Sequence, residues 1–224
     1  MILILTCEHG GNIVPREYQE NFSGAKEILN SHRGYDPGAL DMFWHLQELS
    51  SLHKFHLESR LLVEVNRSLH HPQLFSEFTR GLSIGVKKGI LEEYYFPYRN
   101  SIEDQIANFI AAGEEVLHLS IHSFTPVLNG QIRNTDLGLL FDPARPREKQ
   151  FCQSFKKALQ NFDNSLKSRF NYPYLGKADG FTTHLRKKFP NNYLGIELEV
   201  NQKFVHQNSR GKGASSFNNL TLPP

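Results

Sequence analysis

Three short apolar runs in this 224-residue chain each end abruptly in polar side chains that are capable of chemistry. The runs are rich in β-favouring residues and have the length of buried strands. In open α/β sheets, ligands bind at the carboxyl ends of the strands. The pattern therefore predicts a central sheet with a site at one edge. The runs and the polar residues after them are 2–5 with Glu8 and His9, 61–65 with Asn66 and Arg67, and 116–121 with His122.

Glu8 and His9 stand immediately before two adjacent glycines, Gly10 and Gly11. Glycines after a strand permit a sharp turn and a close approach of the backbone to another group. We therefore take the carboxylate and the imidazole as the first candidates for a functional site. A surface loop that contains a glutamate and a histidine explains the same residues equally well.

Asp36 has two interpretations. Pro37 suits the first turn of a helix, and apolar residues at helical spacing predict a helix over 37–53. Asp36 would then be the N-cap of that helix. The alternative is a metal ligand held at the start of the helix.

Two further places carry charged candidates. Arg67 can hold a substrate carboxylate with a two-pronged hydrogen bond, or it can form a surface salt bridge. In the last predicted strand, 194–200, Glu197 and Glu199 are two residues apart, so both side chains point to one face. An edge strand with one solvated face explains this pair, and so does a catalytic acid or base.

The remaining pattern predicts one α/β domain with a central, mixed, mostly parallel sheet flanked by helices. We assign this domain to residues 1–205 and a polar tail to 206–224. The other expected elements are a helix over 88–112 that Pro97 breaks or kinks, a strand over 137–141, a helix over 147–169, a site-covering loop over 171–180 and a helix over 181–188.

The composition excludes several classes of protein. A formal net charge of +2 is too small to indicate binding to nucleic acid or to an anionic membrane. No apolar run approaches the roughly 20 residues that cross a bilayer, and the N-terminal run is too short for a signal peptide. Two cysteines, Cys7 and Cys152, fit a reducing compartment. We therefore expect a cytoplasmic protein.

His9, Asp36 and His122 together supply two imidazoles and one carboxylate. Zinc accepts such ligands and keeps one position for water in catalytic sites. It lowers the pKa of that water and polarises a carbonyl, and a nearby glutamate can pass the proton to a leaving amine. The sequence lacks the His-Glu-x-x-His helix of many metalloproteases, so these ligands must come from separate parts of the chain.

Five segments resemble the N-formylglutamate amidohydrolase family in the family's order, and the resemblance runs from Leu3 to about Val205. The resemblance implies an α/β fold of the zinc-carboxypeptidase (phosphorylase/hydrolase-like) type. It also implies zinc-dependent cleavage of an N-acyl group from an acidic amino acid. The segments are CEHGGN at 7–12, SHRGYDPGA at 31–39, VEVNR at 63–67, RNTDLGLL at 133–140 and YLGKADG at 174–180.

A more distant similarity to zinc carboxypeptidases assigns roles. The segment 120–124 is similar to the one that carries their last zinc histidine, and Asn66-Arg67 is similar to the pair that holds a substrate carboxylate. The strand at 196–199 is similar to the one with their catalytic glutamate. The resemblance favours Glu199 over Glu197 as the base, because Glu199-Val200-Asn201 fits the family pattern better.

One position departs from carboxypeptidases, which supply a glutamate ligand three residues after the first histidine. Here that residue is Asn12, a poor zinc ligand. The family resemblance points to Asp36 instead, and Glu8 is the competing carboxylate.

We therefore expect a zinc amidohydrolase that acts on a small N-acyl amino acid, with no nucleic-acid or membrane partner. His9, Asp36 and His122 would bind zinc, Glu199 would be the base, and Asn66 and Arg67 would bind the substrate. A carboxypeptidase-like peptidase and a non-catalytic protein that binds a small acidic ligand remain compatible with the sequence.

Overall fold

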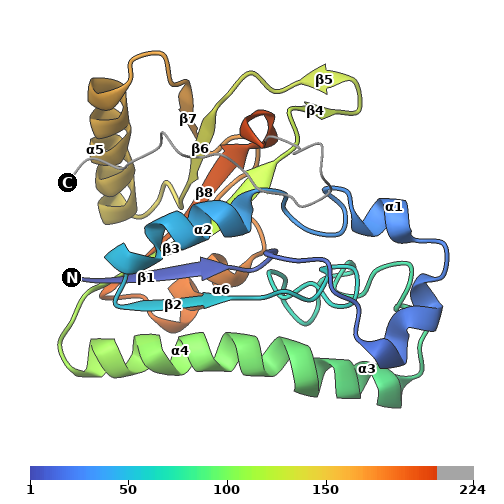
Figure 1. Cartoon of the computed structure of the whole chain (residues 1–224). Helices are drawn as coiled ribbons and strands as arrows, with labels where there is room; N and C mark the ends of the chain where they lie inside the picture. Colours follow the sequence, from blue (N-terminus) through green and yellow to red (C-terminus); the bar gives the residue numbers. More distant parts are fainter. Residues whose placement is uncertain (206–224) are drawn as a thin grey trace.

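A six-stranded sheet with the strand order β2-β1-β3-β8-β6-β7 runs through the centre of the molecule (Figure 1). Neighbouring strands are parallel except β6, which is antiparallel to β8. The computed structural model describes residues 1–205, and the predicted tail lies outside the described residues. The strands are β1 (Ile2–Cys7), β2 (Leu52–Phe55), β3 (Val116–Phe124), β6 (Leu137–Leu140), β7 (Ser168–Phe170) and β8 (Tyr193–Asn201), and a separate hairpin consists of β4 (Val127–Leu128) and β5 (Gln131–Ile132).

Helices cover both faces of the sheet (Figure 1). The α-helices are α1 (Lys26–Leu29), α2 (Ala39–Leu46), α3 (Ile84–Ile90), α4 (Phe96–Ala111), α5 (Pro146–Phe162) and α6 (Phe181–Lys188). Short helices of other types are η1 (Arg16–Phe22), η2 (Gln47–Leu49), η3 (Leu91–Tyr95) and η4 (Gln202–Phe204). The expected α/β class with a mixed, mostly parallel sheet is confirmed.

Two apolar clusters hold the layers together, one on each face of the sheet. Ile4 and Leu5 are neighbours on β1 and both are fully buried, yet they belong to different clusters because successive side chains on a strand face opposite sides. Helices α2 and α5 pack in the cluster that contains Leu5. Helices α4 and α6 pack in the cluster that contains Ile4. Burial on both faces explains why the strands read as continuous apolar runs.

The predicted strand over residues 61–65 is wrong. This segment is buried but irregular, and it packs in the cluster on the α4 side of the sheet. Side chains satisfy its backbone in place of a neighbouring strand: Thr79 donates to the carbonyl of Leu62 at 3.0 Å, and Arg99 donates to the carbonyl of Val65 at 2.7 Å. A short apolar run indicates burial and does not by itself distinguish a strand from a packed loop.

Three predicted helices have other bounds in the structure. The helix expected over 37–53 is α2 followed by η2, and its last residues belong to β2 instead. The helix expected over 147–169 ends at Phe162, and residues 168–170 form β7. The helix expected over 88–112 divides into α3, the π-helical turn η3 and α4. Pro97 is the second residue of α4, which follows directly on the π-helical turn η3, so the regular α-helical pattern is interrupted just before the proline that lacks an N–H.

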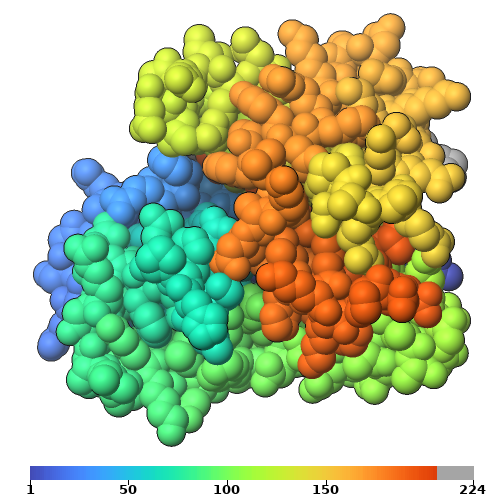
Figure 2. Space-filling model, turned by 180° about the vertical axis from the view of Figure 1, so that it is seen from behind, coloured from blue at the N-terminus to red at the C-terminus, as the bar shows by residue number. Residues whose placement is uncertain are grey.

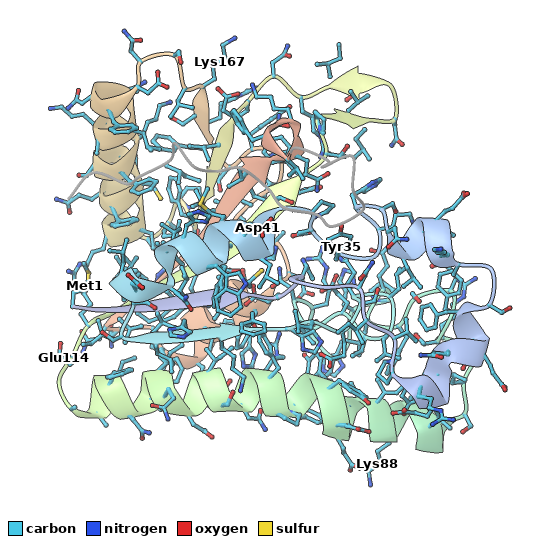
Figure 3. The ribbon with its side chains drawn as sticks, in the orientation of Figure 1. Met1, Tyr35, Asp41, Lys88, Glu114 and Lys167 are labelled. Atoms are coloured by element: carbon cyan, nitrogen blue, oxygen red, sulfur yellow. The ribbon has the colours of Figure 1, made fainter. Side chains whose placement is uncertain are left out.

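Strand β8 lies inside the sheet, between β3 and β6. This position excludes the interpretation of Glu197 and Glu199 as the wet face of an edge strand. At the opposite end of the strands, the N-terminal amine of Met1 and the carboxylate of Glu114 form an ion pair at 3.5 Å, and both residues are labelled in Figure 3. Within residues 1–205, no helix has both the length and the apolar character needed to cross a membrane.

The turn after β1 depends on a close backbone approach. A Cβ atom on Gly11 would lie 2.3 Å from the carbonyl oxygen of Leu57, a distance that real side chains do not tolerate. The backbone of Gly10 also donates to the carbonyl of His56 at 3.0 Å, which fixes this turn against the segment after β2.

We predict that Gly11→Ala lowers the free energy of unfolding by about 1–3 kcal/mol, the usual cost of forcing atoms into a packed site. Gly89→Ala is the matched control, because nothing lies within 4 Å of its Cβ position and it lies in helix α3. This control should be neutral or stabilising by a few tenths of a kcal/mol. Urea unfolding measures both, and equal stabilities would contradict the account of this turn.

Candidate metal centre

His9, Asp36 and His122 meet at the carboxyl ends of the central strands. Oδ2 of Asp36 lies 3.2 Å from Nδ1 of His9 and 2.9 Å from Nδ1 of His122. One potential ligand atom from each residue lies within 4.8 Å of the other two, and all three side chains are buried. The structure therefore brings these sequence candidates together in one cluster.

The fold explains why residues so far apart in sequence meet. β1 and β3 are parallel neighbours, so His9, just after β1, lies beside His122 near the end of β3. The backbone N–H of Asp36 donates to the carbonyl of His9 at 2.9 Å, which ties the loop before α2 to this edge. The predicted capping role of Asp36 is wrong, because the N-cap of α2 is Gly38.

The second ring nitrogen of each histidine faces a carboxylate. Nε2 of His9 lies 2.6 Å from Oε1 of Glu64. Nε2 of His122 lies 2.9 Å from Oγ of Ser120 and 3.4 Å from Oε2 of Glu8. An ionised carboxylate only accepts hydrogen bonds, so Glu64 favours the tautomer of His9 with its proton on Nε2 and leaves Nδ1 free to bind a metal. Carboxylates behind histidine ligands are common in metal sites.

Arg60 links the two carboxylates beside His9. Its Nη1 donates to Oδ1 of Asp36 at 3.2 Å, and its Nε donates to Oε2 of Glu64 at 2.7 Å. Burial opposes ionisation of Glu64, but the charges of Arg60 and His9 outweigh it and hold the pKa of Glu64 well below its usual range. The same balance, with His9 and His122 as the main partners, holds the pKa of Asp36 far below its usual range. Both carboxylates are therefore ionised at neutral pH.

Protons compensate the charges elsewhere in the cluster. Burial works against protonation of His122, but its hydrogen bond to Asp36 raises its pKa to about 10. Burial also raises the pKa of Glu199 to about 8, with the charge of His122 opposing and that of Asp36 adding to this shift. At neutral pH both groups therefore hold a proton in the chain alone.

Glu199 and His122 are register partners on β8 and β3. Glu199 is 4% exposed, and its Oε2 has no hydrogen-bond partner within residues 1–205. Glu197, on the same face of β8, accepts a hydrogen bond from Oγ1 of Thr182 at 2.7 Å. Of the two, only Glu199 thus keeps an unused buried oxygen at the site.

Glu8 lies behind His122 rather than among the cluster atoms. It is fully buried and accepts hydrogen bonds from Oγ of Ser120 at 2.5 Å and from the hydroxyl of Tyr98 at 3.3 Å. The geometry therefore places Asp36, and not Glu8, between the two imidazoles.

A cavity of about 440 Å³ opens above the cluster, and the segments that form its wall meet on the face shown in Figure 2. Asn66 and Arg67 line it, although no strand precedes them, and their role in binding substrate stays a prediction. The side chain of Asn66 accepts from the backbone of Phe181 at 2.7 Å, and Arg67 donates to the carbonyl of Asp179. The predicted covering loop over 171–180 also contributes to the wall.

Sequence reasoning missed several residues of this site. Arg60 and Glu64 flank the apolar run at 61–63 and form an ion pair. Their spacing of four residues indicates such a pair only in a helix or turn, and the segment was interpreted as a strand. His32, Phe124, Thr125 and Tyr174 also line the cavity. His32, Phe124 and Tyr174 lie in segments that carry the family and carboxypeptidase resemblances, but the sequence did not assign these side chains a role.

These observations suit a metal ion. Two imidazole nitrogens and one carboxylate oxygen form the donor set that zinc accepts. Both histidines are oriented from behind by carboxylates, and the unpartnered oxygen of Glu199 faces the same space without being needed as a ligand. The residues present therefore fit a zinc ion, and their role as ligands is a prediction.

One family model matches the whole of the described chain. The family model described as N-formylglutamate amidohydrolase matches residues 1–205. No curated protein matches the sequence.

Two solved structures are similar to this chain. The gene product Atu2144 from Agrobacterium tumefaciens is 26% identical with a TM-score of 0.76, and the match covers 90% of this chain and 81% of that one. N-formylglutamate amidohydrolase from Ralstonia eutropha JMP134 is 14% identical with a TM-score of 0.67, and the match covers 92% of this chain and 83% of that one. At 14% identity the second likeness shows the fold alone.

The pKa of Glu199 predicts a pH dependence of stability in metal-free protein. Its folded pKa of about 8 exceeds the ordinary value of 4.5, so the folded state keeps a proton that the unfolded state loses. Stability is therefore greatest below the ordinary value and falls as pH rises towards 8. Between the two pKa values, the free energy of unfolding of the wild type should fall by on the order of a few kcal/mol relative to that of Glu199→Gln. Urea unfolding at several pH values measures the difference, and a constant difference would contradict it.

Proposed function

This chain belongs to the N-formylglutamate amidohydrolase family, and we propose that it is a zinc enzyme that hydrolyses the N-acyl amide of an acidic amino acid such as N-formylglutamate. The family supports an amidohydrolase activity. The observation that carries the zinc proposal is the convergence of His9, Asp36 and His122 beneath a cavity that also contains a protonated, unpartnered glutamate.

Nδ1 of His9, Nδ1 of His122 and Oδ2 of Asp36 would hold the ion. When bound, zinc supplies a Lewis acid that polarises a carbonyl and makes water more acidic. Its positive charge would also favour the ionised form of Glu199, since an opposite charge nearby lowers the pKa of a carboxylate.

Glu199 is the proposed base. Its carboxylate takes a proton from the attacking water as the water oxygen bonds to the amide carbon. It then gives that proton to the departing nitrogen as the carbon–nitrogen bond breaks, which releases the acyl acid and the amino acid. The unused Oε2 leaves room for this exchange.

Two cationic side chains would position the substrate. Arg67 lines the cavity and can pair with a substrate carboxylate. Arg60 also lines it, and its hydrogen bonds to Asp36 and Glu64 hold the guanidinium rigidly beside the metal-binding atoms, where it can stabilise negative charge on the carbonyl oxygen.

Arg133 supports a preference for an acidic side chain in the substrate. Its guanidinium lies 5.3 Å from the ring of Tyr174 and 6.0 Å from the ring of Phe124, and both rings line the cavity. Within residues 1–205 it forms no ion pair with a carboxylate. Arg133 is not itself part of the cavity wall, but its Nη1 donates to the hydroxyl of the lining residue Tyr174 at 3.3 Å. Its guanidinium can therefore bind a second carboxylate beside the cavity.

The test of the proposed function is hydrolysis of N-formylglutamate by protein loaded with one equivalent of zinc. We expect turnover that stops on chelation and returns with zinc. Glu199→Gln should lower kcat about 10²–10⁴-fold while zinc remains bound, as loss of a general base does. Glu197→Gln is the matched control and should change kcat less than about tenfold, since that side chain is engaged with Thr182.

Two results would contradict the proposal. Faster hydrolysis of short peptides than of N-formyl amino acids would indicate a carboxypeptidase-like enzyme. Binding of acidic ligands without turnover by the zinc-loaded wild type would indicate a non-catalytic binding protein.

We predict that Arg133→Gln abolishes discrimination between N-formylglutamate and its neutral isostere N-formylglutamine. The kcat/KM for N-formylglutamate divided by that for N-formylglutamine should fall about 10–100-fold, the usual contribution of a hydrogen bond between charged groups. Arg169→Gln removes the same charge from the ring of Tyr172, away from the cavity, and should leave the ratio unchanged. An unchanged ratio in Arg133→Gln would remove Arg133 from the substrate site.

A further inference from the structure

A second cavity of about 300 Å³ adjoins the chain segment that carries the proposed substrate-binding residues. Asn66 and Arg67 line the first cavity, and the next residues, Ser68 and His70, line the second. The start of α4 and the side chain of His184 on α6 complete the wall. The proposed hydrolysis uses none of the residues that line this second cavity.

One residue of the cavity wall, Arg99, is a cation that is almost wholly buried. Its side chain is on α4 and is 4% exposed. Nη1 donates to the carbonyl of Val65 at 2.7 Å and, more weakly, to that of Arg67 at 3.4 Å. The guanidinium also stacks 4.3 Å from the ring of Phe181 and 4.9 Å from that of Tyr95. Burial lowers its pKa, which shows the cost of keeping this charge inside the protein.

Part of the guanidinium remains available to a ligand. Within residues 1–205, Nε and Nη2 of Arg99 donate no hydrogen bond to the protein. Neither nitrogen is fully enclosed by protein. Because Arg99 lines the cavity, a ligand there can approach them.

Arg99 differs from the other buried arginine in lacking a carboxylate. Arg186, the other buried arginine of residues 1–205, pairs with the fully buried Glu148 at 2.9 Å. Arg60, which is only partly buried, pairs with Glu64 at 2.5 Å. In the described part of the chain, no carboxylate oxygen lies within ion-pair distance of Arg99. Buried charges in proteins are normally paired, because an unpaired charge loses its hydration without compensation.

The acidic residue of this cavity is already neutralised. Glu103 lines the wall, but its carboxylate forms an ion pair with Lys188 and lies 2.7 Å from Nε2 of His184. Asn100, the residue after Arg99 in α4, is exposed and contributes a neutral amide to the cavity wall. Within residues 1–205, Arg99 therefore has no direct ion-pair partner. The carboxylates of Glu8, Glu103 and Asp179 oppose the lowering of its pKa only from beyond ion-pair distance.

We propose that this cavity is a second, non-catalytic site for a small oxyanion, a carboxylate or a phosphate, which pairs with Nε and Nη2 of Arg99. A guanidinium with two free donors matches the paired oxygens of such an anion. The ligand would supply the charge that Glu148 supplies to Arg186. This site is independent of the proposed hydrolysis and does not require zinc.

The test is isothermal titration of the full chain, loaded with zinc, with inorganic phosphate and separately with acetate. The informative variant is Asn100→Asp, which adds a carboxylate to the cavity without touching the hydrogen bonds of Arg99. It should weaken anion binding about tenfold or more, because a like charge a few ångströms away repels the ligand. Asn108→Asp is the matched control on the exposed side of α4, outside the cavity, and should retain binding.

Each outcome decides the proposal. Binding of phosphate alone assigns a phosphate-bearing ligand, and binding of acetate assigns a carboxylate. Equal affinities in Asn100→Asp and the wild type would place the anion elsewhere, for example at Arg67, and would overturn the proposal. The absence of binding at millimolar anion would also overturn the proposal. Arg99 would then serve only to donate hydrogen bonds to the carbonyls of Val65 and Arg67.

Discussion

The convergence of two imidazole nitrogens on one carboxylate oxygen is the constraint on which this site depends. Oδ2 of Asp36 lies 3.2 Å and 2.9 Å from the Nδ1 atoms of His9 and His122, and all three residues are buried at the floor of the cavity. Burying so many ionisable groups costs free energy unless their charges balance. In the chain alone, protons provide this balance, and the raised pKa values of His122 and Glu199 are its sign. A divalent cation would supply positive charge at the same place, displacing the proton from His122 as it binds.

The sheet provides the precision that such a site requires. Because β1, β3 and β8 are adjacent and parallel, their carboxyl ends bring His9, His122 and Glu199 to one edge without long loops. Rigid strands hold these side chains, and buried Glu64 and Glu8 orient the two histidines from behind. The remaining parts of the cavity wall, the segments around Arg67 and Tyr174, come from loops. This division is usual where a rigid frame carries the chemistry and loops select the substrate.

The sequence predicted the parts of the structure that rest on local pattern or on the family motifs. His9 and His122 follow or end apolar runs that are strands, so their meeting could be anticipated. For Asp36 the sequence left a helix cap and a metal ligand open, and the family resemblance favoured the ligand. Strand β2 was missed because its sequence, LHKF, has no apolar run and follows a helical pattern. The roles of Arg60, Glu64 and Glu8 could not be predicted, since they depend on where side chains point after a turn. The irregular path of residues 61–65 decides that direction through long-range packing.

The most direct test of the central claim is a crystal structure of zinc-loaded protein with anomalous difference density measured on both sides of the zinc absorption edge. The account predicts one strong peak bounded by Nδ1 of His9, Nδ1 of His122 and Oδ2 of Asp36, with Glu199 beside it and unligated. A peak at another place, such as the buried thiol of Cys7, or no peak at full zinc loading would contradict it.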